Sequence, residues 1–380
     1  MIWKMSGNRD LAVLVGNGLS IAFSDDLLLG SISNEMIARF TAEYPGSDAV
    51  AQAMQNVAKH DLTGDPAADF EILIGAFGGQ SDILDDLSVF ADLIRNSDPD
   101  TVNAFQKVRE FVAEVQRRGI GHTLEIIAER SYADEARRQP VDDFVAKVLS
   151  KFTKKVTIAN LNYDAVLLSS LLSNKHDDVL CDMADGRWPG TVTVDGIEYD
   201  TKRLRQTEDD FMSFDQRRVR LLHLHGSITY WEFGRYQIKL PTNAIRSTIW
   251  KKYRNEETFS GRPLVVLANQ NSKARHVLRQ PFALAYELSE SSFRDADYWL
   301  IVGYSFRDVC VNDLLRRCWE VRRDKPMILV STMGDGLTNA TIETALGWEL
   351  GTGATNRLQV DRGGAFALCD SEAWKSFISS

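Results

Sequence analysis

The amino-acid sequence predicts an α/β protein: a Rossmann-like, mostly parallel sheet with a large helical insertion after the first strand. Two observations support this fold class. Short apolar runs such as Leu11–Val15 and Tyr298–Val302 are typical of buried strands. Between the later runs lie stretches with apolar residues at three- and four-residue spacings, the pattern of amphipathic helices. Strands that alternate with helices favour a parallel sheet covered by helices on its faces.

The first strand, Leu11–Val15, ends at the turn signal Gly16-Asn17-Gly18. Few strand signals follow until about residue 130, so we expect a helical insertion over residues 34–149. Within it, helical spacing predicts four amphipathic segments: Ala49–His60, Ala67–Phe77, Ile83–Ile94 and Val102–Arg117.

Strand and helix signals then alternate through the rest of the chain. Strands are expected at Lys155–Ala159, Thr191–Tyr199, Val219–Leu224, Leu264–Ala268, Tyr298–Val302 and Met327–Ser331. Helices are expected at Tyr163–Leu172, Pro281–Phe293 and Val309–Arg323. Residues 186–215 are polar and rich in turn signals, which favours a hairpin-bearing lid or a small satellite. Residues 1–33 and 150–335 would thus form the main domain, and residues 336–380 a C-terminal appendage.

Composition narrows the classes of function. Among 380 residues, 44 Lys and Arg stand against 53 Asp and Glu, a net charge of −9. That balance argues against direct binding of nucleic acid, which depends on basic surfaces. No apolar run approaches the roughly 18 residues of a membrane-spanning helix, and no secretory signal is visible. The four cysteines lack C-x-x-C spacing, so a zinc ribbon is not indicated. We expect a reduced, cytoplasmic protein without a membrane partner.

Two polar turns follow the first two strands of the expected sheet, where ligands bind in folds of this type. Gly16-Asn17-Gly18-Leu19-Ser20 offers glycines, a hydroxyl and a helix N-terminus, which suit a phosphate; a plain turn is the alternative. No acidic ribose ligand stands about twenty residues further on, as it does in a standard dinucleotide fold. In the second turn, Asn162 and Asp164 are suited to bind sugar hydroxyls or orient a water, although Asp164 would also serve as a helix cap.

A third turn contains two histidines, His223 and His225, followed by Gly226. Strand alternation places both histidines on one face. A metal site needs further ligands, and no second His or Cys cluster supplies them. A hydrogen-bonded core histidine and a catalytic base remain as interpretations of His225, and a glycine beside it would let a substrate approach closely. A fourth turn, Gly303-Tyr304-Ser305, follows a later strand, so the four turns together predict one rim.

The order G-N-G-L-S, N-L-N-Y-D, L-H-G-S, G-Y-S resembles the sirtuin signature series G-A-G-I-S, T-Q-N-I-D, H-G, G-T-S. The resemblance spans about Leu11 to Thr332 and is greatest to the sirtuin-like domains of bacterial antiviral defence systems. It implies that residues 1–33 and 150–335 form an NAD-binding domain with His225 as the catalytic histidine. The candidate NAD-binding residues are Gly16, Asn17, Gly18, Ser20, Asn162, Asp164, Gly226, Gly303, Ser305 and Thr332, with Ser331 near the adenosine.

Three departures separate the chain from protein-deacylating sirtuins. It has no four-cysteine zinc module, it lacks the G-I-P-D-F-R continuation after Ser20, and its helical insertion differs. The defence-type relatives that it resembles are similar to NAD glycohydrolases, which would cause abortive infection by depleting NAD⁺. NAD⁺ is therefore the expected substrate, and no metal is expected.

The chemistry assigns a task to each of three candidate catalytic residues. Asn162 would position water or the carboxamide, Asp164 would bind the nicotinamide-ribose end, and His225 would accept a proton. Three other functions remain open: a non-catalytic sensor of NAD or ADP-ribose, a zinc-free protein deacylase or ADP-ribosyltransferase, and a metal-dependent hydrolase using His223 and His225.

Control of a toxic NAD-cleaving enzyme must come from assembly or from another protein, because the sequence contains no G-x-x-x-x-G-K-[ST] motif. Relatives of this size resemble the effector half of two-gene systems that pair with a HerA-type hexameric ATPase or a short argonaute. The many apolar faces between Asn34 and Arg130 also predict a homo-oligomer.

Overall fold

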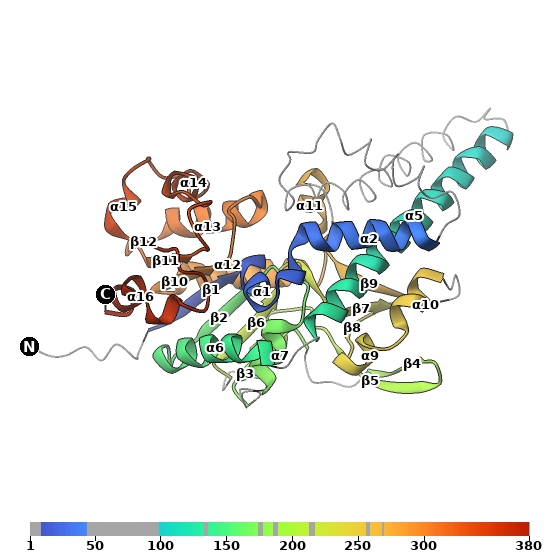
Figure 1. Cartoon of the computed structure of the whole chain (residues 1–380), viewed down its shortest axis with the longest axis horizontal. Coiled ribbons are helices and arrows are strands. Elements are labelled where there is room, and N and C mark those ends of the chain that lie inside the picture. Colours follow the sequence, from blue (N-terminus) through green and yellow to red (C-terminus); the bar gives the residue numbers. More distant parts are fainter. Residues whose placement is uncertain are drawn as a thin grey trace, which may run out of the picture.

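Seven parallel strands form the central sheet of the computed structural model (Figure 1). The structure describes residues 9–43, 99–132, 136–173, 178–184, 189–212, 217–255, 259–267 and 270–379. Across the sheet the order is β12 (Leu358–Asp361), β11 (Met327–Ser331), β10 (Tyr298–Val302), β1 (Leu11–Val15), β2 (Val156–Asn160), β6 (Val219–His223) and β3 (Leu180–Asp182). The predicted Rossmann-like α/β fold is confirmed.

The direction of strand addition reverses at β1. From β1 the chain first builds β2 and β6 on one side and later returns to place β10 on the other. The register keeps these strand ends level, because Val15 pairs with Asn160 on one side and with Val302 on the other. Open α/β sheets bind ligands outside the carboxyl ends of their strands, at such a switch point. The turn that begins at Gly16 lies there.

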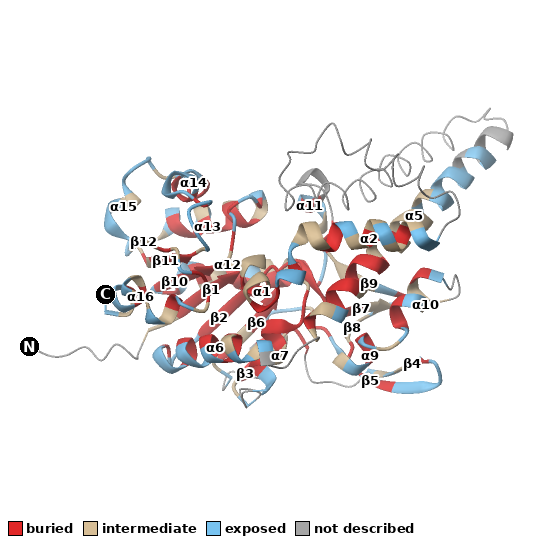
Figure 2. Cartoon of the chain, viewed as in Figure 1, coloured by how far each residue is buried: buried red, intermediate tan, exposed pale blue. Residues whose placement is uncertain are grey.

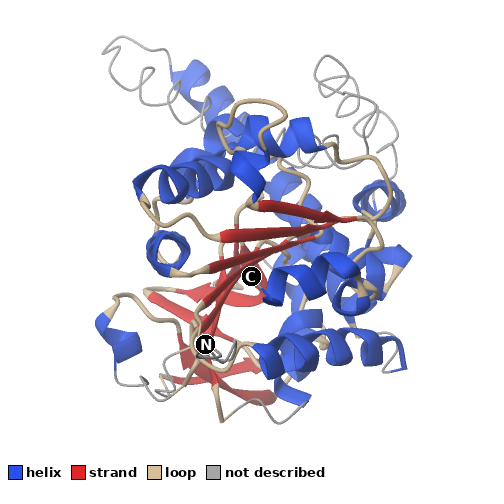
Figure 3. Cartoon of the chain, turned by 90° about the vertical axis from the view of Figure 1, so that its left-hand side faces the viewer, coloured by secondary structure: helices blue, strands red, loops and turns tan. Residues whose placement is uncertain are grey.

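Helices cover both faces of the sheet, which explains why β1, β2 and β10 are buried along their whole length (Figure 3). One face packs through side chains such as Leu14 and Trp299 against α12 (Phe282–Asp295), α13 (Val309–Val321) and α14 (Asn339–Ala345). The other packs through Val13 and Leu300 against α1 (Asn17–Phe23), α6 (Gln139–Lys151), α7 (Val166–Ser173) and α16 (Glu372–Ser379). These continuous apolar strands are typical of a parallel sheet between two helical layers.

A second, antiparallel sheet lies beside the first (Figures 1 and 2). Its strand order is β4 (Gly190–Val194), β5 (Ile197–Arg203), β8 (Tyr236–Lys239), β7 (Gly226–Phe233) and β9 (Gly261–Val265). Its core includes Trp231 and Trp250, together with residues of α2 (Leu29–Glu43), α5 (Pro99–Ser131), α9 (Thr242–Ile245) and α10 (Ile249–Asn255). The short helices α8 (Asp209–Met212), α11 (Gln270–His276) and α15 (Gly353–Asn356) complete the described helices.

Buried ion pairs join the helices of the insertion to α10. Arg254 of α10 is buried and contacts Glu125 of α5 at 2.5 Å. His122 of α5 lies beside this pair, and burial together with the Arg254 charge lowers the pKa of His122 to about 4. A neutral imidazole there removes a repulsive charge from the helix interface.

The large helical insertion after the first strand is confirmed by α1, α2, α5 and α6, which all precede β2. The expected helix Val102–Arg117 lies within α5. The three segments expected to be helical between residues 49 and 94 lie outside the described residues. Residues 336–380 include β12, which pairs in parallel with β11 at the edge of the central sheet.

The expected single strand Thr191–Tyr199 is wrong, because a hairpin turn at Asp195-Gly196 divides it into β4 and β5. Both turn residues have positive φ, 51° and 77°. Asp-Gly is a favoured pair for a two-residue hairpin loop, because both positions require the left-handed region.

The described part of the chain contains no helix of the length and apolar character needed to cross a membrane. The four cysteines all lie in that part, and each is a free thiol.

Candidate functional site

Ser20, Asn162 and Asp164 meet at the carboxyl ends of β1 and β2, beside the switch point, and are called the Ser20 cluster. The Asn162 amide Nδ2 donates to the carbonyl oxygen of Gly16 at 3.0 Å and to Ser20 Oγ at 2.8 Å. The Ser20 hydroxyl in turn donates to Asp164 Oδ2 at 2.5 Å. All three side chains are buried. The end of β2 is thus bonded directly to the turn after β1, as the strand-end turns predicted.

Asp164 combines the two interpretations that the sequence left open. Its Oδ1 accepts from the Val166 backbone N–H at 2.9 Å and so caps the first turn of α7. Its Oδ2 is held by Ser20 within the cluster. Burial raises the pKa of Asp164, and the hydrogen bonds from Ser20 and Val166 only partly oppose that rise.

His223 is a core histidine. It is 2% exposed, its Nδ1 lies 3.4 Å from Asn160 Nδ2, and its ring meets Tyr230 edge-on at 5.3 Å. Burial lowers the pKa of His223 to about 4, so the imidazole is neutral. Within the described residues, no group of three or more His, Cys, Asp and Glu side chains could hold a metal ion.

The glycines of the first and fourth turns pack against each other. Gly18 N–H donates to the carbonyl oxygen of Gly303 at 2.9 Å. Gly303 has a φ of +63°, and a Cβ placed on it would lie 2.6 Å from the Gly18 Cα. Backbone contact between the β1 and β10 turns therefore accounts for glycine at both positions, and it fixes the two strand ends on either side of the switch point.

The remaining candidate binding residues lie around this edge in different settings. Asn17 is half-buried and its amide donates to the Leu27 carbonyl at 3.3 Å. Ser305 is exposed. Thr332 is half-buried, and its backbone N–H donates to the carbonyl of Asp361. Ser331 is buried, with its hydroxyl 3.4 Å from Asp361 Oδ2.

His225 lies where the chain passes from β6 of the parallel sheet to β7 of the antiparallel sheet. Its imidazole Nε2 is 3.2 Å from Asp308 Oδ2 and 3.3 Å from the Tyr286 hydroxyl. The ring centroid is 6.4 Å from that of Tyr163, which stands between Asn162 and Asp164 in the chain. His225 is therefore close to the ring of Tyr163, in the segment that carries Asn162 and Asp164, but its own ring is buried beside a carboxylate that the sequence analysis did not assign to the site.

Gly226 allows the backbone of β9 to approach the residue after His225 closely. Gly226 has a φ of +86°, and a Cβ there would lie 2.1 Å from the carbonyl oxygen of Leu264. The next hydrogen bond, from Val266 N–H to the carbonyl oxygen of His225, holds the histidine backbone to the end of the same strand at 2.8 Å.

Asp308 links His225 to a buried cation. Lys273 Nζ of α11 lies 2.5 Å from Asp308 Oδ2, and Asp308 Oδ1 accepts from Val311 N–H at 3.1 Å as the cap of α13. Burial opposes the charge on Asp308, but His225 and Lys273 outweigh it and hold the pKa of Asp308 well below its usual range.

The sequence analysis missed three residues of this group: Asp308, Lys273 and Tyr286. Asp308 carried one signal, its position as a capping residue directly before a predicted helix. Lys273 and Tyr286 carried none, since a single Lys or Tyr in a helical stretch is ordinary.

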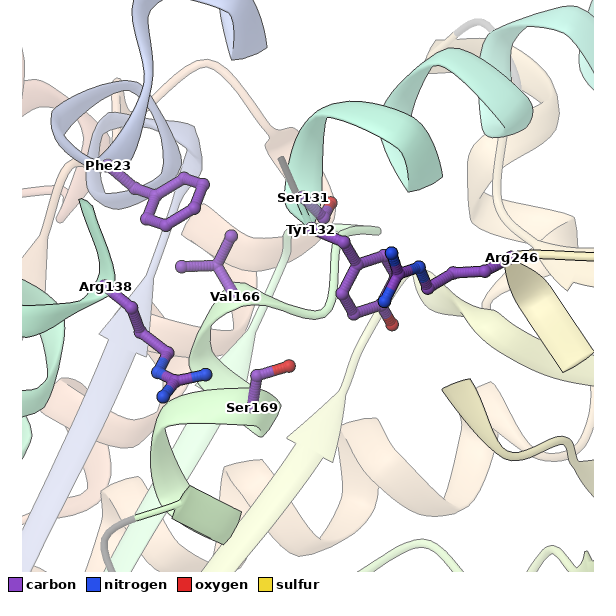
Figure 4. Close-up of a pocket in the computed structure, with 7 residues that line it drawn as sticks. All are labelled: Phe23, Ser131, Tyr132, Arg138, Val166, Ser169 and Arg246. Carbon is purple, nitrogen blue, oxygen red and sulfur yellow. The ribbon is translucent and has the colours of Figure 1, made fainter. Parts of the chain in front are cut away.

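A pocket adjoins the Ser20 cluster on the α7 side (Figure 4). Val166, whose N–H bonds to Asp164, is one of its walls. The pocket measures about 410 Å³, including space open to solvent, and is lined by Phe23, Ser131, Tyr132, Arg138, Val166, Ser169 and Arg246. Burial raises the pKa of Tyr132, and the charge of Asp164 adds to the rise. Two guanidinium groups favour an anionic group here over the cationic nicotinamide ring of NAD⁺.

No protein-family model matches this chain, and no curated protein matches it either. The resemblance to sirtuin-like proteins thus stays a prediction that depends on the four motifs.

Proposed function

We propose that the chain is an NAD⁺ glycohydrolase that cleaves NAD⁺ to nicotinamide and ADP-ribose. The observation that supports this most is the direct contact of Ser20, Asn162 and Asp164 at the carboxyl ends of β1 and β2, beside the switch point of the sheet. Amide, hydroxyl and carboxyl groups at that point are suited to a sugar. His225 follows the adjacent strand and supplies a group that titrates near neutral pH in its unperturbed form.

The reaction does not need a strong general acid. Nicotinamide leaves NAD⁺ as a neutral base, so the enzyme has to stabilise an oxocarbenium-like ribose and place a water. The bond from ribose C1′ to the nicotinamide nitrogen breaks, and its electron pair stays on that nitrogen. The water oxygen bonds to C1′ and its proton passes to His225 and then to solvent.

Each residue of the Ser20 cluster has a task in this scheme. Asn162 orients the water or the carboxamide, and Asp164 holds the nicotinamide-ribose end. Because Asn162 and Ser20 now bond each other, substrate binding would exchange their hydrogen bonds for bonds to ribose hydroxyls. Such an exchange keeps every buried polar group paired before and after binding.

Product analysis of the purified full chain with NAD⁺ tests the proposal. We expect nicotinamide and free ADP-ribose in equal amounts, and much slower formation of both by Asn162→Ala and His225→Ala. Acylated or protein-linked ADP-ribose would instead identify a deacylase or a transferase. Bound but uncleaved NAD⁺, with or without a partner protein, would identify a sensor.

We further propose that the chain is a cytoplasmic effector of antiviral defence, controlled by a partner, either a HerA-type hexameric ATPase or a short argonaute, and active as a homo-oligomer. The support is the motif order and the danger that an uncontrolled NAD-consuming enzyme poses to its own cell. Light scattering of the isolated chain and cellular NAD⁺ levels with and without the neighbouring gene product test it. A monomer that is fully active alone would contradict it.

A further inference from the structure

Three ionisable side chains are buried together beside the candidate base. The side chains of His225, Asp308 and Lys273 are 6%, 7% and 3% exposed. Burying charged groups is unfavourable unless each is paired, and packed apolar groups of similar volume are often as stable or more so. The arrangement therefore calls for a reason other than core packing.

The cap of α13 does not supply that reason. A cap needs one oxygen, and Asp308 uses Oδ1 for the N–H of Val311. The other oxygen, Oδ2, lies 2.5 Å from Lys273 Nζ and 3.2 Å from His225 Nε2. Lys273 comes from α11 and His225 from the junction of the two sheets, so Oδ2 joins two separate elements at the imidazole.

We propose that Asp308 is the positioning residue of His225, that it fixes the imidazole with a proton on Nε2, and that Lys273 anchors the Asp308 carboxylate. The proposal rests on the proposed function and deepens it. An ionised carboxylate oxygen can only accept a hydrogen bond, so the position of Asp308 Oδ2 at 3.2 Å from Nε2 favours a proton on that nitrogen. In the neutral ring the proton-accepting nitrogen is then Nδ1. A carboxylate that holds a histidine tautomer in this way contributes strongly to catalysis in other hydrolases.

Lys273 has a second effect on His225. Its positive charge disfavours a further proton on the nearby imidazole, whereas the Asp308 charge favours one. Within the described residues, the ionisable groups near the His225 ring and its carboxylate include Asp308 at the start of α13, Cys310 in α13, Lys273 in α11, Tyr286 in α12 and Tyr163 after β2.

Asp308→Asn is the first test, because Asn keeps an oxygen for the cap and removes the charge. We expect kcat for NAD⁺ to fall about 100-fold or more, within the range of lost acid–base catalysis, with KM changed by less than about threefold. The double variant Asp308→Asn/His225→Ala should be no slower than His225→Ala, since Asp308 acts through His225. Multiplying losses would overturn the proposal. Asp313→Asn, on the same helix and paired with Arg316, is the matched control and should keep wild-type kcat.

The pH–rate profile is the second test. If Asp308 and Lys273 had only a structural role, their substitution would not shift the acid limb of this profile in opposite directions. Lys273→Gln should shift the acid limb to higher pH by about one unit, because a cation near the ring is lost. Asp308→Asn should shift the limb to lower pH, because an anion is lost. Shifts in the same direction, or none, would overturn the assignment.

The ring nitrogen signals of the six histidines give a readout that does not need activity. Nitrogen-15 NMR of the full chain, with His225→Ala to assign the signal, should show His225 protonated at Nε2 in the wild type and altered in Asp308→Asn. A wild-type ring protonated only at Nδ1 would overturn the inference. The wild-type protein could leave NAD⁺ intact and still show His225 protonated at Nε2, with the signal altered in Asp308→Asn. That result would contradict the proposed function but support the positioning role of Asp308.

Discussion

Two buried carboxylates near the carboxyl ends of the parallel strands each accept a backbone hydrogen bond at the start of a helix, but their electrostatic surroundings are opposite. Asp164 and Asp308 each cap a helix with Oδ1, through Val166 and Val311. The Oδ2 of Asp164 takes a neutral Ser20 hydroxyl, whereas the Oδ2 of Asp308 takes Lys273 and His225. The pKa of Asp164 is raised by burial, and the pKa of Asp308 is lowered by its cations despite burial.

The difference shows that the capping role explains the contacts of Oδ1 in each carboxylate but not those of Oδ2. Groups whose pKa values are pushed apart by their environments commonly divide acid and base tasks in one site. Here the Ser20 cluster, in which Asp164 accepts from the neutral donors Ser20 and Val166, is called the neutral half and is suited to hold a sugar. The His225–Asp308–Lys273 group is the charged half, suited to move a proton. Variants in each half should therefore differ in kind.

The largest effect is expected in the charged half, from His225→Ala. Loss of the base should lower turnover of NAD⁺ about 10²- to 10⁴-fold, while NAD⁺ binding changes little. Turnover assays and calorimetric titration measure the two quantities. The matched control is His223→Ala, since His223 is a neutral core histidine and its loss should reduce turnover much less. Equal losses in the two variants would remove the distinction between the histidines.

The second effect concerns stability and contrasts the two carboxylates directly. Asp308→Ala leaves Lys273 buried without its carboxylate and should lower the free energy of unfolding by about 3–5 kcal/mol. Asp164→Ala loses a cap and a hydrogen bond and should lower it by about 1–3 kcal/mol. Urea unfolding of both variants measures this. If Asp164→Ala proves the more destabilising, the pairing of Asp308 with Lys273 and His225 does not contribute more to stability than the hydrogen bonds of Asp164.

The third effect lies in the neutral half. Asn162→Ala removes the amide that joins Ser20 to Gly16, and we expect kcat to fall by about 10- to 100-fold with a smaller change in NAD⁺ affinity. Steady-state kinetics and calorimetry separate the two. Lost affinity with normal turnover at saturation would make Asn162 a binding group alone.

The parallel sheet could be predicted from the sequence to a useful degree. The strands β1, β10 and β11 have the expected bounds, because each is a short apolar run buried on both faces and followed by a turn. The antiparallel sheet could be predicted only in part, through the hairpin expected within residues 186–215, where β4 and β5 pair. Its strand β7 packs against α5, which lies far away in the chain, so its burial pattern depends on tertiary packing.

The site divides in the same way. Ser20 and Asn162 were expected together because the ends of parallel strands meet at one edge, although 142 positions separate them. The contact between Asp308 and His225 could not be predicted in this way, because Asp308 lies at the start of a helix and not directly at a strand end. Lys273 reaches Asp308 from the short helix α11, whose position follows from the packing around it and from no local motif.

The smallest effect is a pH dependence that separates the two carboxylates by sign. Because the folded-state pKa of Asp164 is raised, its contribution to stability is present below the unfolded pKa of about 3.9 and is lost as pH rises through the folded value. Asp164→Asn does not titrate, so its stability relative to wild type should improve between pH 4 and pH 7. The folded pKa of Asp308 is lowered, so its contribution is present above about pH 3.9 and is lost as pH falls. Asp308→Asn should therefore lose ground to wild type as pH rises toward about 4, below the range in which Asp164→Asn gains. Thermal unfolding of the three proteins from about pH 2 to about pH 7 measures both slopes, and slopes of the same sign would mean that the two carboxyl pKa values are not shifted in opposite directions.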